Sequence, residues 1–335
     1  MTARSKPKTN HAQLFMSEEY VEAAIKKIQQ AKSRVRLITA IMTEDDSTRR
    51  LITSLCAAAK RGVDVEVGAD VFTFGIQDES WNPVRAFGNN LRAARSMRSH
   101  LLEAGVSFQW IGRLGPVLFA GRTHIKWCVV DDYVFSFGGI NLYKPGLTHS
   151  DYMFGISDPD LADRLEQEHR RIVHADKIDK FYRSHQFESS LGIVHIDGGF
   201  FNNSSIYRRA CQLALEAEKI LYVSQYCPSG RLSGILKHSS TRFFFNHWRQ
   251  APGFNRILIW FSMMTTRIKP DYKRKHYIHA KFIIFEMSDG QKIALTGSHN
   301  FVHGGVLLGT REIALETANL DIISQLERFW KKNIA

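Results

Sequence analysis

One short pattern of reactive residues occurs twice in this chain of 335 residues. Both copies have the spacing His-x-Lys-x4-acid, which is filled by His124, Lys126 and Asp131 and then by His279, Lys281 and Glu286. Each residue of the first copy lies 155 positions before its counterpart (124 to 279, 126 to 281 and 131 to 286). Because that separation is the length of an ordinary domain, the repeat predicts two related halves with one copy each.

The residues around each copy predict a strand hairpin. An apolar run follows each His-x-Lys pair, over 127–130 and 282–285, and is typical of a buried strand. Alternate side chains of a strand point to one side, so the histidine and lysine of each copy share a face. Return strands are expected over 133–137 and 292–296. They end in Gly138-Gly139-Ile140-Asn141 and in Gly297-Ser298-His299-Asn300.

If the two hairpins face each other, a single site holds two histidines, two lysines, Asn141 and Asn300. Small residues at Gly139 and Ser298 allow the backbone to approach a ligand closely. The lysines and amides can stabilise the negative charge of a phosphodiester. One imidazole can attack phosphorus while the other moves the proton, so the set predicts two-step transfer that requires no metal and no cofactor.

Two further carboxylates are candidates for orienting the imidazoles. Asp151 and Glu312 follow the two motifs at similar distances, and each begins an apolar segment. A carboxylate on the far nitrogen of a histidine improves its nucleophilicity. The interpretation is that each acid supports the histidine of its own copy, whereas Asp131 and Glu286 at strand ends have structural or supporting roles.

These motifs resemble those of the phospholipase D superfamily, and the Gly-Gly-Ile-Asn sequence after the first copy is most similar to bacterial cardiolipin synthases. The resemblance implies an α/β fold of two pseudo-symmetric α-β-α sandwich halves with the active site at their interface. It also implies a phosphohistidine intermediate, with His124 as the nucleophile and His279 as the acid and base. The chain departs from the family pattern at Glu286, which replaces an aspartate, and at Gly139, which lacks the hydroxyl of Ser298.

The order of predicted elements supports two halves. In the first half, helices are expected at 17–28, 47–60 and 97–104, and strands at 35–41, 63–68 and 106–111. A similar order recurs in the second half, with helices at 205–219 and 232–238 and strands at 220–224 and 256–261. We expect a disordered basic tail at 1–16, a first half at 17–180 and a second half at 190–335. An insertion at 73–93 is either a substrate lid or a surface excursion.

The composition favours an anionic partner. The net charge is +12 and the pI is about 9.6. Five cations precede the second motif, and they either bind phosphate groups of lipid or nucleic acid, which is the favoured interpretation, or form a solvated loop: Arg267, Lys269, Lys273, Arg274 and Lys275. The apolar segment 115–120 and the aromatic segment 242–249 suit either a bilayer interface or ordinary core packing.

Other sequence features restrict the cellular setting. The four cysteines have no Cys-x2-Cys spacing, which predicts reduced thiols rather than disulfides or zinc. No apolar stretch approaches the length of a membrane-spanning helix, and there is no signal-peptide pattern. We therefore expect a cytoplasmic protein that is peripheral at the inner membrane face.

Three classes of function remain. The leading hypothesis is a phosphatidyltransferase or phospholipase D, similar to cardiolipin synthases, that acts on phospholipid at an anionic membrane surface without an obligate protein partner. The alternative is a metal-independent endonuclease of the same superfamily, whose partner would be nucleic acid. A binding module that kept the fold is disfavoured because histidine, lysine and asparagine are intact in both copies.

Overall fold

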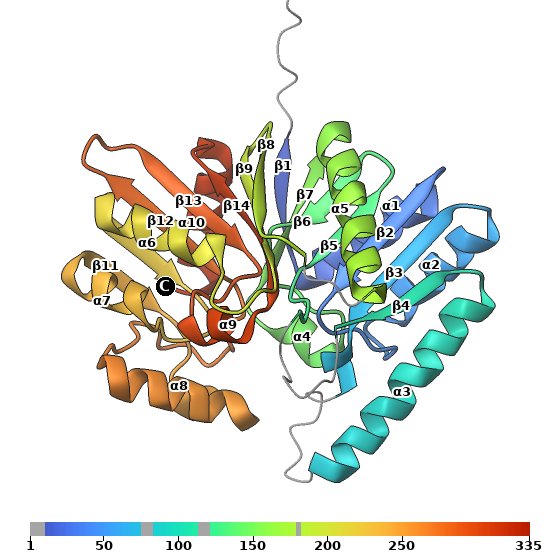
Figure 1. Cartoon of the computed structure of the whole chain (residues 1–335), viewed down its shortest axis with the longest axis horizontal. Helices are drawn as coiled ribbons and strands as arrows, with labels where there is room; N and C mark the ends of the chain where they lie inside the picture. Colours follow the sequence, from blue (N-terminus) through green and yellow to red (C-terminus); the bar gives the residue numbers. More distant parts are fainter. Residues whose placement is uncertain (1–10, 75–82, 113–120, 179–181) are drawn as a thin grey trace, which may run out of the picture.

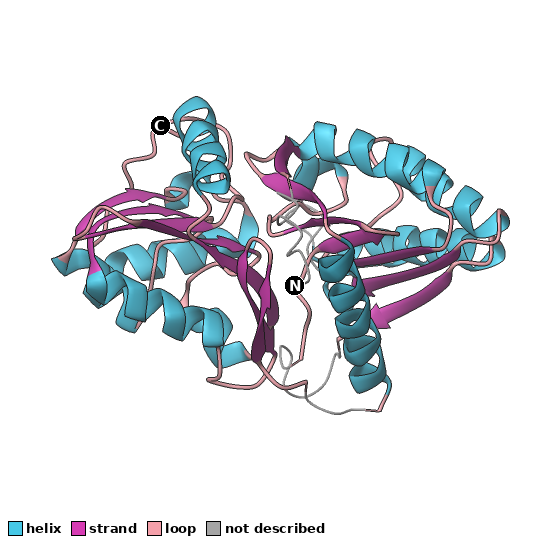
Figure 2. Cartoon of the chain, turned by 90° about the horizontal axis from the view of Figure 1, so that it is seen from above, coloured by secondary structure: helices cyan, strands magenta, loops and turns pink. Residues whose placement is uncertain are grey.

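The computed structural model describes residues 11–74, 83–112, 121–178 and 182–335. Two seven-stranded sheets stand side by side, each in its own half of the chain (Figure 1). Viewed from above, each sheet has helices on both faces (Figure 2). The predicted α/β architecture of two sandwich halves is therefore confirmed.

The first half is built around a sheet of order β1-β7-β6-β5-β2-β3-β4, in which β2, β3 and β4 are parallel and the other neighbours are antiparallel. Its elements are β1 (Ala12–Met16), α1 (Ser17–Gln30), β2 (Arg34–Thr39), α2 (Arg49–Lys60), β3 (Asp64–Asp70), the 3-10 helix η1 (Val71–Phe74), α3 (Pro83–Glu103), β4 (Ser107–Ile111), β5 (Trp127–Val130), β6 (Tyr133–Ser136), α4 (Lys144–Thr148), β7 (Tyr152–Ser157) and α5 (Pro159–Lys177).

The second half is built around a sheet of order β11-β10-β12-β13-β14-β9-β8. Its elements are β8 (His185–Ser189), β9 (Gly192–Gly198), α6 (Ser205–Glu216), β10 (Ala217–Val223), α7 (Arg231–His238), β11 (Ser240–Phe244), the 3-10 helix η2 (Trp248–Gln250), α8 (Gly253–Thr266), β12 (Phe282–Met287), β13 (Lys292–Gly297), α9 (His303–Leu308), β14 (Arg311–Thr317) and α10 (Leu320–Asn333).

Six strands of one sheet correspond to six of the other. The run β1-β7-β6-β5-β2-β3 matches β9-β14-β13-β12-β10-β11 in order and direction. The motif strands β5 and β12 are central in both, and the residues of β5 are buried throughout, as their apolar sequences predict. The additional strands, β4 and β8, lie at opposite edges of this shared arrangement.

Apolar packing is divided among three clusters. One joins α1, α2 and α3 to the outer face of the first sheet, and another joins α6, α7 and α9 to the outer face of the second. The third contains residues of both halves, including Phe154, Phe282 and Phe329. This third cluster lies between the two sheets. Because side chains of both halves pack together in it, it fixes the position of one half relative to the other.

The structure corrects several boundaries that the sequence suggested. Residues 12–16 are not part of a tail, because they form β1 and pair antiparallel with β7; residues 1–10 lie outside the described residues. The second half begins with β8 at His185 rather than at 190. The segment 256–261 is not a strand but belongs to α8. Residues 83–93 of the expected insertion form the start of α3.

The two apolar segments proposed for membrane contact have different outcomes. Residues 115–120 lie outside the described residues. In the segment 242–249, Phe244 and Phe245 are buried, and the Arg242 guanidinium lies over the rings of Phe244 and Trp330. Core packing therefore accounts for most of the aromatic side chains of that segment.

The acids that complete the two motifs have separate structural roles. The Asp131 carboxylate accepts hydrogen bonds from the backbone N–H groups of Lys32, Ser33 and Arg34 at 2.9–3.0 Å, which fixes the start of β2 against the β5–β6 turn. Glu286 instead forms an exposed ion pair with Lys219. Both acids lie at the end of the motif strand away from the histidine.

These two roles predict different costs of substitution. Asp131→Ala should lower the free energy of unfolding by about 1.5–3 kcal/mol, because three backbone donors lose a charged acceptor. Glu286→Gln should leave the stability unchanged, because an exposed ion pair contributes little. Urea denaturation of both variants tests this, and equal stability of the two would contradict the assignment for Asp131.

Candidate active site

Backbone pairing between the two halves brings the motif histidines together. The His124 N–H donates to the carbonyl of Arg311 at 2.8 Å, and the Arg311 N–H donates to the carbonyl of Arg122 at 2.7 Å. The same pattern recurs with exchanged halves: His279 donates to Ser150 at 3.0 Å, and Ser150 donates to Tyr277 at 2.9 Å. Each motif histidine is thus paired with the residue that precedes the carboxylate of the other half.

The carboxylates are consequently exchanged between the halves. Nδ1 of His124 lies 2.9 Å from Glu312 Oε2, and Nδ1 of His279 lies 2.6 Å from Asp151 Oδ2. The expectation that each acid serves the histidine of its own copy is therefore wrong, although both acids belong to the site. With Nδ1 held in both rings, Nε2 is the nitrogen left for chemistry.

The two motif lysines are buried beside the histidines. Lys126 Nζ donates to the carbonyl of His124 at 2.9 Å, and Lys281 Nζ donates to the carbonyl of His279 and lies 3.0 Å from its Nδ1. Burial lowers the pKa of Lys126 to about 8, although Glu312 and Asp151 oppose the shift. Burial lowers the pKa of Lys281 to about 7, with Asp151 opposing and Lys126 contributing. The lysines therefore lie in a site that disfavours their positive charge until an anion enters.

The same environment acts on the histidines and their acids. Burial, Lys126 and Lys281 lower the pKa of His124 well below its ordinary value. Burial and Lys281 do the same to the pKa of His279, against the hydrogen bond that its Nδ1–H donates to Asp151. Burial disfavours the charged form of Asp151, but the hydrogen bond and charge of His279, together with Lys281 and the Tyr152 N–H, lower the pKa of that carboxyl. Neutral imidazoles beside an ionised acid are the form required of a nucleophile or a base.

Gly139 and Ser298 lie directly against these pairs. Ser298 Oγ donates to Glu312 Oε2 at 2.5 Å. At the corresponding place in the other half, the Gly139 N–H donates to Asp151 Oδ1 at 3.2 Å. A Cβ at Gly139 would lie 2.7 Å from Asp151 Oδ2 and 2.9 Å from the carbonyl oxygen of His279. Space, rather than the loss of a useful hydroxyl, therefore accounts for glycine in the first copy.

The two asparagines follow these positions by two residues. In both Asn141 and Asn300 the side-chain Oδ1 is buried and has no hydrogen-bond partner among the described residues. Buried polar groups normally find partners, and the oxygen and nitrogen of an amide exchange places by rotation about the terminal bond. These two amides are therefore available to a ligand.

The predicted substrate-binding cations do not reach the paired side chains. Arg267, Lys269, Lys273, Arg274 and Lys275 are all exposed in the loop between α8 and the second motif. Arg274 donates to the backbone carbonyls of Lys332 and Ala335 near the chain terminus. The role of this cluster in substrate binding stays a prediction.

Sequence reasoning missed an aromatic group beside His279. The ring of His149 lies 5.6 Å from that of His279 and 5.0 Å from that of Tyr277. Burial and Lys281 lower the pKa of His149 to about 4, and its buried Nδ1 has no partner among the described residues. The position corresponding to His149 before Glu312 is occupied by Thr310, so the repeat gave no signal for it.

An ion pair behind the first motif was also missed. The Arg122 guanidinium donates to Asp70 at 2.8 and 3.0 Å, and the Thr123 N–H donates to the other oxygen of the same carboxylate. Because Asp70 ends β3, this pair anchors the segment that carries His124 to the first sheet. An Arg–Asp pair separated by 52 residues has no local signature in the sequence.

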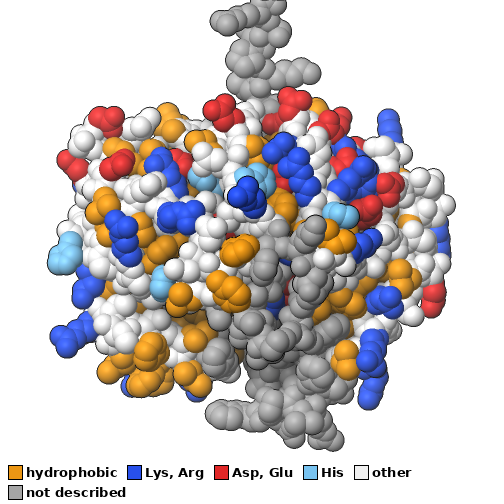
Figure 3. Space-filling view, viewed as in Figure 1, with side chains coloured by type: hydrophobic (Ala, Val, Ile, Leu, Met, Phe, Trp, Pro, Cys, Tyr) orange, Lys and Arg blue, Asp and Glu red, His pale blue; other side chains and the backbone are white. Residues whose placement is uncertain are grey.

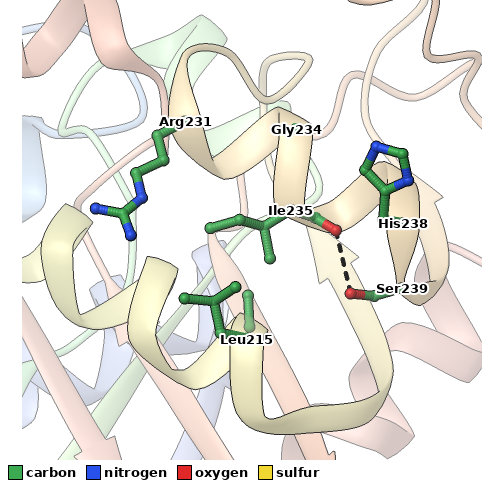
Figure 4. Close-up of a pocket in the computed structure, with 7 residues that line it drawn as sticks. Leu215, Arg231, Gly234, Ile235, His238 and Ser239 are labelled. Atoms are coloured by element: carbon green, nitrogen blue, oxygen red, sulfur yellow. Dashed lines mark hydrogen bonds between the residues drawn. The ribbon is translucent and has the colours of Figure 1, made fainter.

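Other surface features of the described residues lie away from these side chains. No three His, Cys, Asp or Glu side chains converge as a metal site in the part of the chain that the structure describes. A hollow between α6 and α7 is lined by Leu215, Arg231, Ile235 and His238 (Figure 4). It lies beside the start of β10 and β11, at the end of the sheet opposite the histidines.

Comparison with known proteins finds similar sequences for part of the chain. Residues 24–173 match the family described as cardiolipin synthase, PLD-like domain. Over 180 residues, 50% of this chain, the sequence is 31% identical to cardiolipin synthase B of Escherichia coli K12. The first half of the chain is therefore similar in sequence to this PLD-like domain. The sequence of the chain is also 28% identical to cardiolipin synthase B of Salmonella typhimurium over 189 residues, 52% of this chain. These matches cover 40% and 42% of the relatives' own lengths.

Solved structures with a similar fold cover nearly the whole chain. The phosphatidylserine synthase of Haemophilus influenzae superposes with a TM-score of 0.72 at 13% identity, covering 97% of this chain and 87% of that one. The polyphosphate kinase of Porphyromonas gingivalis superposes with a TM-score of 0.58 at 11% identity, covering 95% and 49%. At such low sequence identities the similarity is one of fold alone, and it extends over both halves of this chain.

The exchanged carboxylates predict a distinctive spectroscopic pattern. In Asp151→Asn, the downfield Nδ1 proton signal of His279 should shift or disappear while that of His124 is retained, because the two rings use different acids. Glu312→Gln should do the reverse. Proton NMR near neutral pH, with signals assigned from His124→Gln and His279→Gln, tests this, and loss of the signal of the same-half histidine would contradict the exchange.

Proposed function

We propose that this protein is a phosphatidyltransferase that moves a phosphatidyl group between alcohols through a phosphohistidine. The observation that carries the proposal is the pair of exchanged His–carboxylate contacts, each with a buried lysine, at one interface. Two equivalent nucleophile and proton-transfer groups around one anion site suit a double displacement at phosphorus.

The reaction has two steps. Binding of the anionic phosphodiester favours the protonated form of His279. Nε2 of His124 then attacks phosphorus while the bond from phosphorus to the departing alcohol breaks, and protonated His279 gives its Nε2 proton to that alcohol. The incoming hydroxyl then loses its proton to His279 and attacks the phosphohistidine, which restores His124. We assign the nucleophile to His124 because its side chain is 22% exposed, whereas that of His279 is 7% exposed. The lysines and the amides of Asn141 and Asn300 stabilise the charge on the phosphoryl oxygens.

The proposed donor is a phospholipid. The curated relatives are named cardiolipin synthases, and a solved structure with the same fold is named a phosphatidylserine synthase. Together with the net charge of +12, these relatives favour an anionic lipid at a membrane surface, and we place the protein at the inner face of that membrane. Among the described residues, no helix has the length and apolar character needed to span a bilayer.

The assignment of His124 predicts a severe loss in one variant. His124→Ala should reduce transfer from phosphatidylglycerol by at least about a thousandfold and abolish trapping of a phospho-enzyme, because no other group replaces the nucleophile. Mass spectrometry of the lipid products and of acid-labile protein phosphate measures both. His238→Ala is the matched control, since this exposed histidine on α7 should be dispensable.

Two results would overturn the proposal. Turnover by His124→Ala at the wild-type rate would refute the role of this residue. Cleavage of DNA or RNA without added metal, combined with no turnover of phospholipid in mixed micelles, would instead assign the site to the endonuclease alternative.

The lowered lysine pKa values predict pH-dependent binding of anions. Sulfate should bind more tightly as the pH falls from about 9 to about 6, by on the order of tenfold, because the lysines gain protons and attract the anion. The change should centre on their pKa values of about 8 and about 7. Isothermal titration calorimetry in two buffers should show proton uptake on binding. Lys281→Met should lose the lower step, and an affinity independent of pH would contradict the shifts.

A further inference from the structure

Helix α8 presents its more apolar face to solvent. Its outward side chains are 41–62% exposed and include Ile257, Leu258, Trp260, Phe261 and Met264. The side chains that are buried or half-buried are Asn255, Ile259, Ser262, Met263 and Thr266. A surface helix normally directs its apolar stripe toward the core, so the polarity of α8 is reversed. An exposed apolar patch of this kind indicates a surface that is covered in the working protein.

This patch is concentrated on one helix. In the space-filling view, apolar side chains gather at the lower left of the molecule, where α8 lies in the cartoon (Figures 1 and 3). Trp260 is 45% exposed within it. A tryptophan among aliphatic side chains suits the boundary between water and lipid, because its ring is apolar and its N–H remains polar.

Cations surround the patch. Residues 249–275 contain seven lysines and arginines and a single acid, Asp271. Arg256 is exposed on α8 itself, and Arg267 follows its last residue. The carboxylate of Asp271 accepts a hydrogen bond from the Phe243 N–H, so it is engaged with β11. An apolar helix flanked by cations attracts anionic lipid, whereas two such surfaces would repel each other in a dimer of this chain.

The helix lies at the same end of the molecule as the site. It is inserted between β11 and the segment that carries His279, and Asn246 of this connection exchanges hydrogen bonds with Ile278 at 2.7 and 2.8 Å. On α8 itself, Asn255 accepts a hydrogen bond from Tyr226 at 2.7 Å. Helices α4 and α9, which follow Asn141 and Asn300, lie at the same lower end (Figure 1). A surface that contacts α8 therefore meets the molecule at the end that carries the paired histidines.

From these observations we propose that α8 lies in the headgroup region of an anionic bilayer and holds the protein with its site facing the lipid. The choice of a lipid surface rests on the proposed function. Ile257, Leu258, Trp260, Phe261 and Met264 insert among the acyl chains, while Arg256 and the cations after α8 contact lipid phosphates. In this proposal, α8 holds the protein at the lipid surface that contains its substrate. The paired histidines, and not α8, make and break bonds.

The test is partitioning onto vesicles. Wild-type protein should sediment with vesicles of phosphatidylcholine and phosphatidylglycerol, and less with phosphatidylcholine alone. The double variant Ile257→Ser/Phe261→Ser should bind the anionic vesicles at least about tenfold more weakly, because two large side chains no longer leave water. Lys269→Glu/Lys273→Glu should lose the preference for the anionic vesicles, and added salt should weaken binding of the wild type.

A matched control separates this helix from general surface hydrophobicity. Leu215 on α6 and Leu320 on α10 are 61% and 73% exposed, at the end of the second sheet opposite the site. Leu215→Ser/Leu320→Ser should bind vesicles like the wild type. Both serine variants should keep wild-type turnover of detergent-dispersed phospholipid and an unchanged thermal unfolding temperature, since all four side chains are exposed.

Each outcome bears on one proposal. Absence of wild-type binding to anionic vesicles, or equal binding by Ile257→Ser/Phe261→Ser, overturns the membrane role of α8. A wild-type dimer in solution that this variant converts to a monomer also overturns it and assigns the patch to a second copy. Vesicle binding without phosphatidyl transfer leaves the role of α8 standing and refutes the proposed function instead.

Discussion

The site depends on backbone hydrogen bonds that join the two halves just before each motif. The residue ahead of Asp151 pairs with His279, and the residue ahead of Glu312 pairs with His124. Because alternate residues of paired extended segments have fixed directions, this pairing brings each imidazole to the carboxylate of the opposite half. The shared core between the sheets keeps the two segments in register. Neither half alone contains a motif histidine together with its carboxylate, so the candidate site exists only where the two halves meet.

The same interface buries ionisable side chains whose charged forms are unfavourable away from water. Two lysines are buried beside two neutral histidines, and burial lowers the pKa of all four groups. Such an arrangement costs folding stability, and an anion bound beside the lysines would compensate their charge. Gly139 shows how closely this region is packed, since even one added carbon would approach Asp151 and His279. The proposed membrane contact of α8 would place this anion site beside a surface rich in phosphodiesters.

Much of the architecture could be predicted from local patterns. The apolar runs after each His-x-Lys pair became the central strands β5 and β12, and the offset of 155 residues corresponds to matching positions in two sheets. Sequence patterns were less informative for segments whose structure depends on which side chains the rest of the fold buries or pairs. The uninterrupted apolar sequence from Ile257 to Phe261 fits a strand as well as a helix. The strand prediction assumed burial, whereas all of these side chains except that of Ile259 are exposed on a helix. Likewise, β1 was assigned to a tail because its short sequence becomes a strand only by pairing with the edge of β7.

The sequence by itself determined the reactive groups, their duplication and the strands that carry them, because these follow from residue type and from spacings of a few positions. Only the tertiary structure decided which acid serves which histidine. The actual partners are separated by 188 and 128 residues, whereas each acid lies much nearer along the chain to the histidine of its own copy. Short-range patterns contain no information about such a choice, since it is made by strand pairing across the interface. The outward apolar face of α8 was decided in the same way, because only the packed fold shows which side of a helix the core covers.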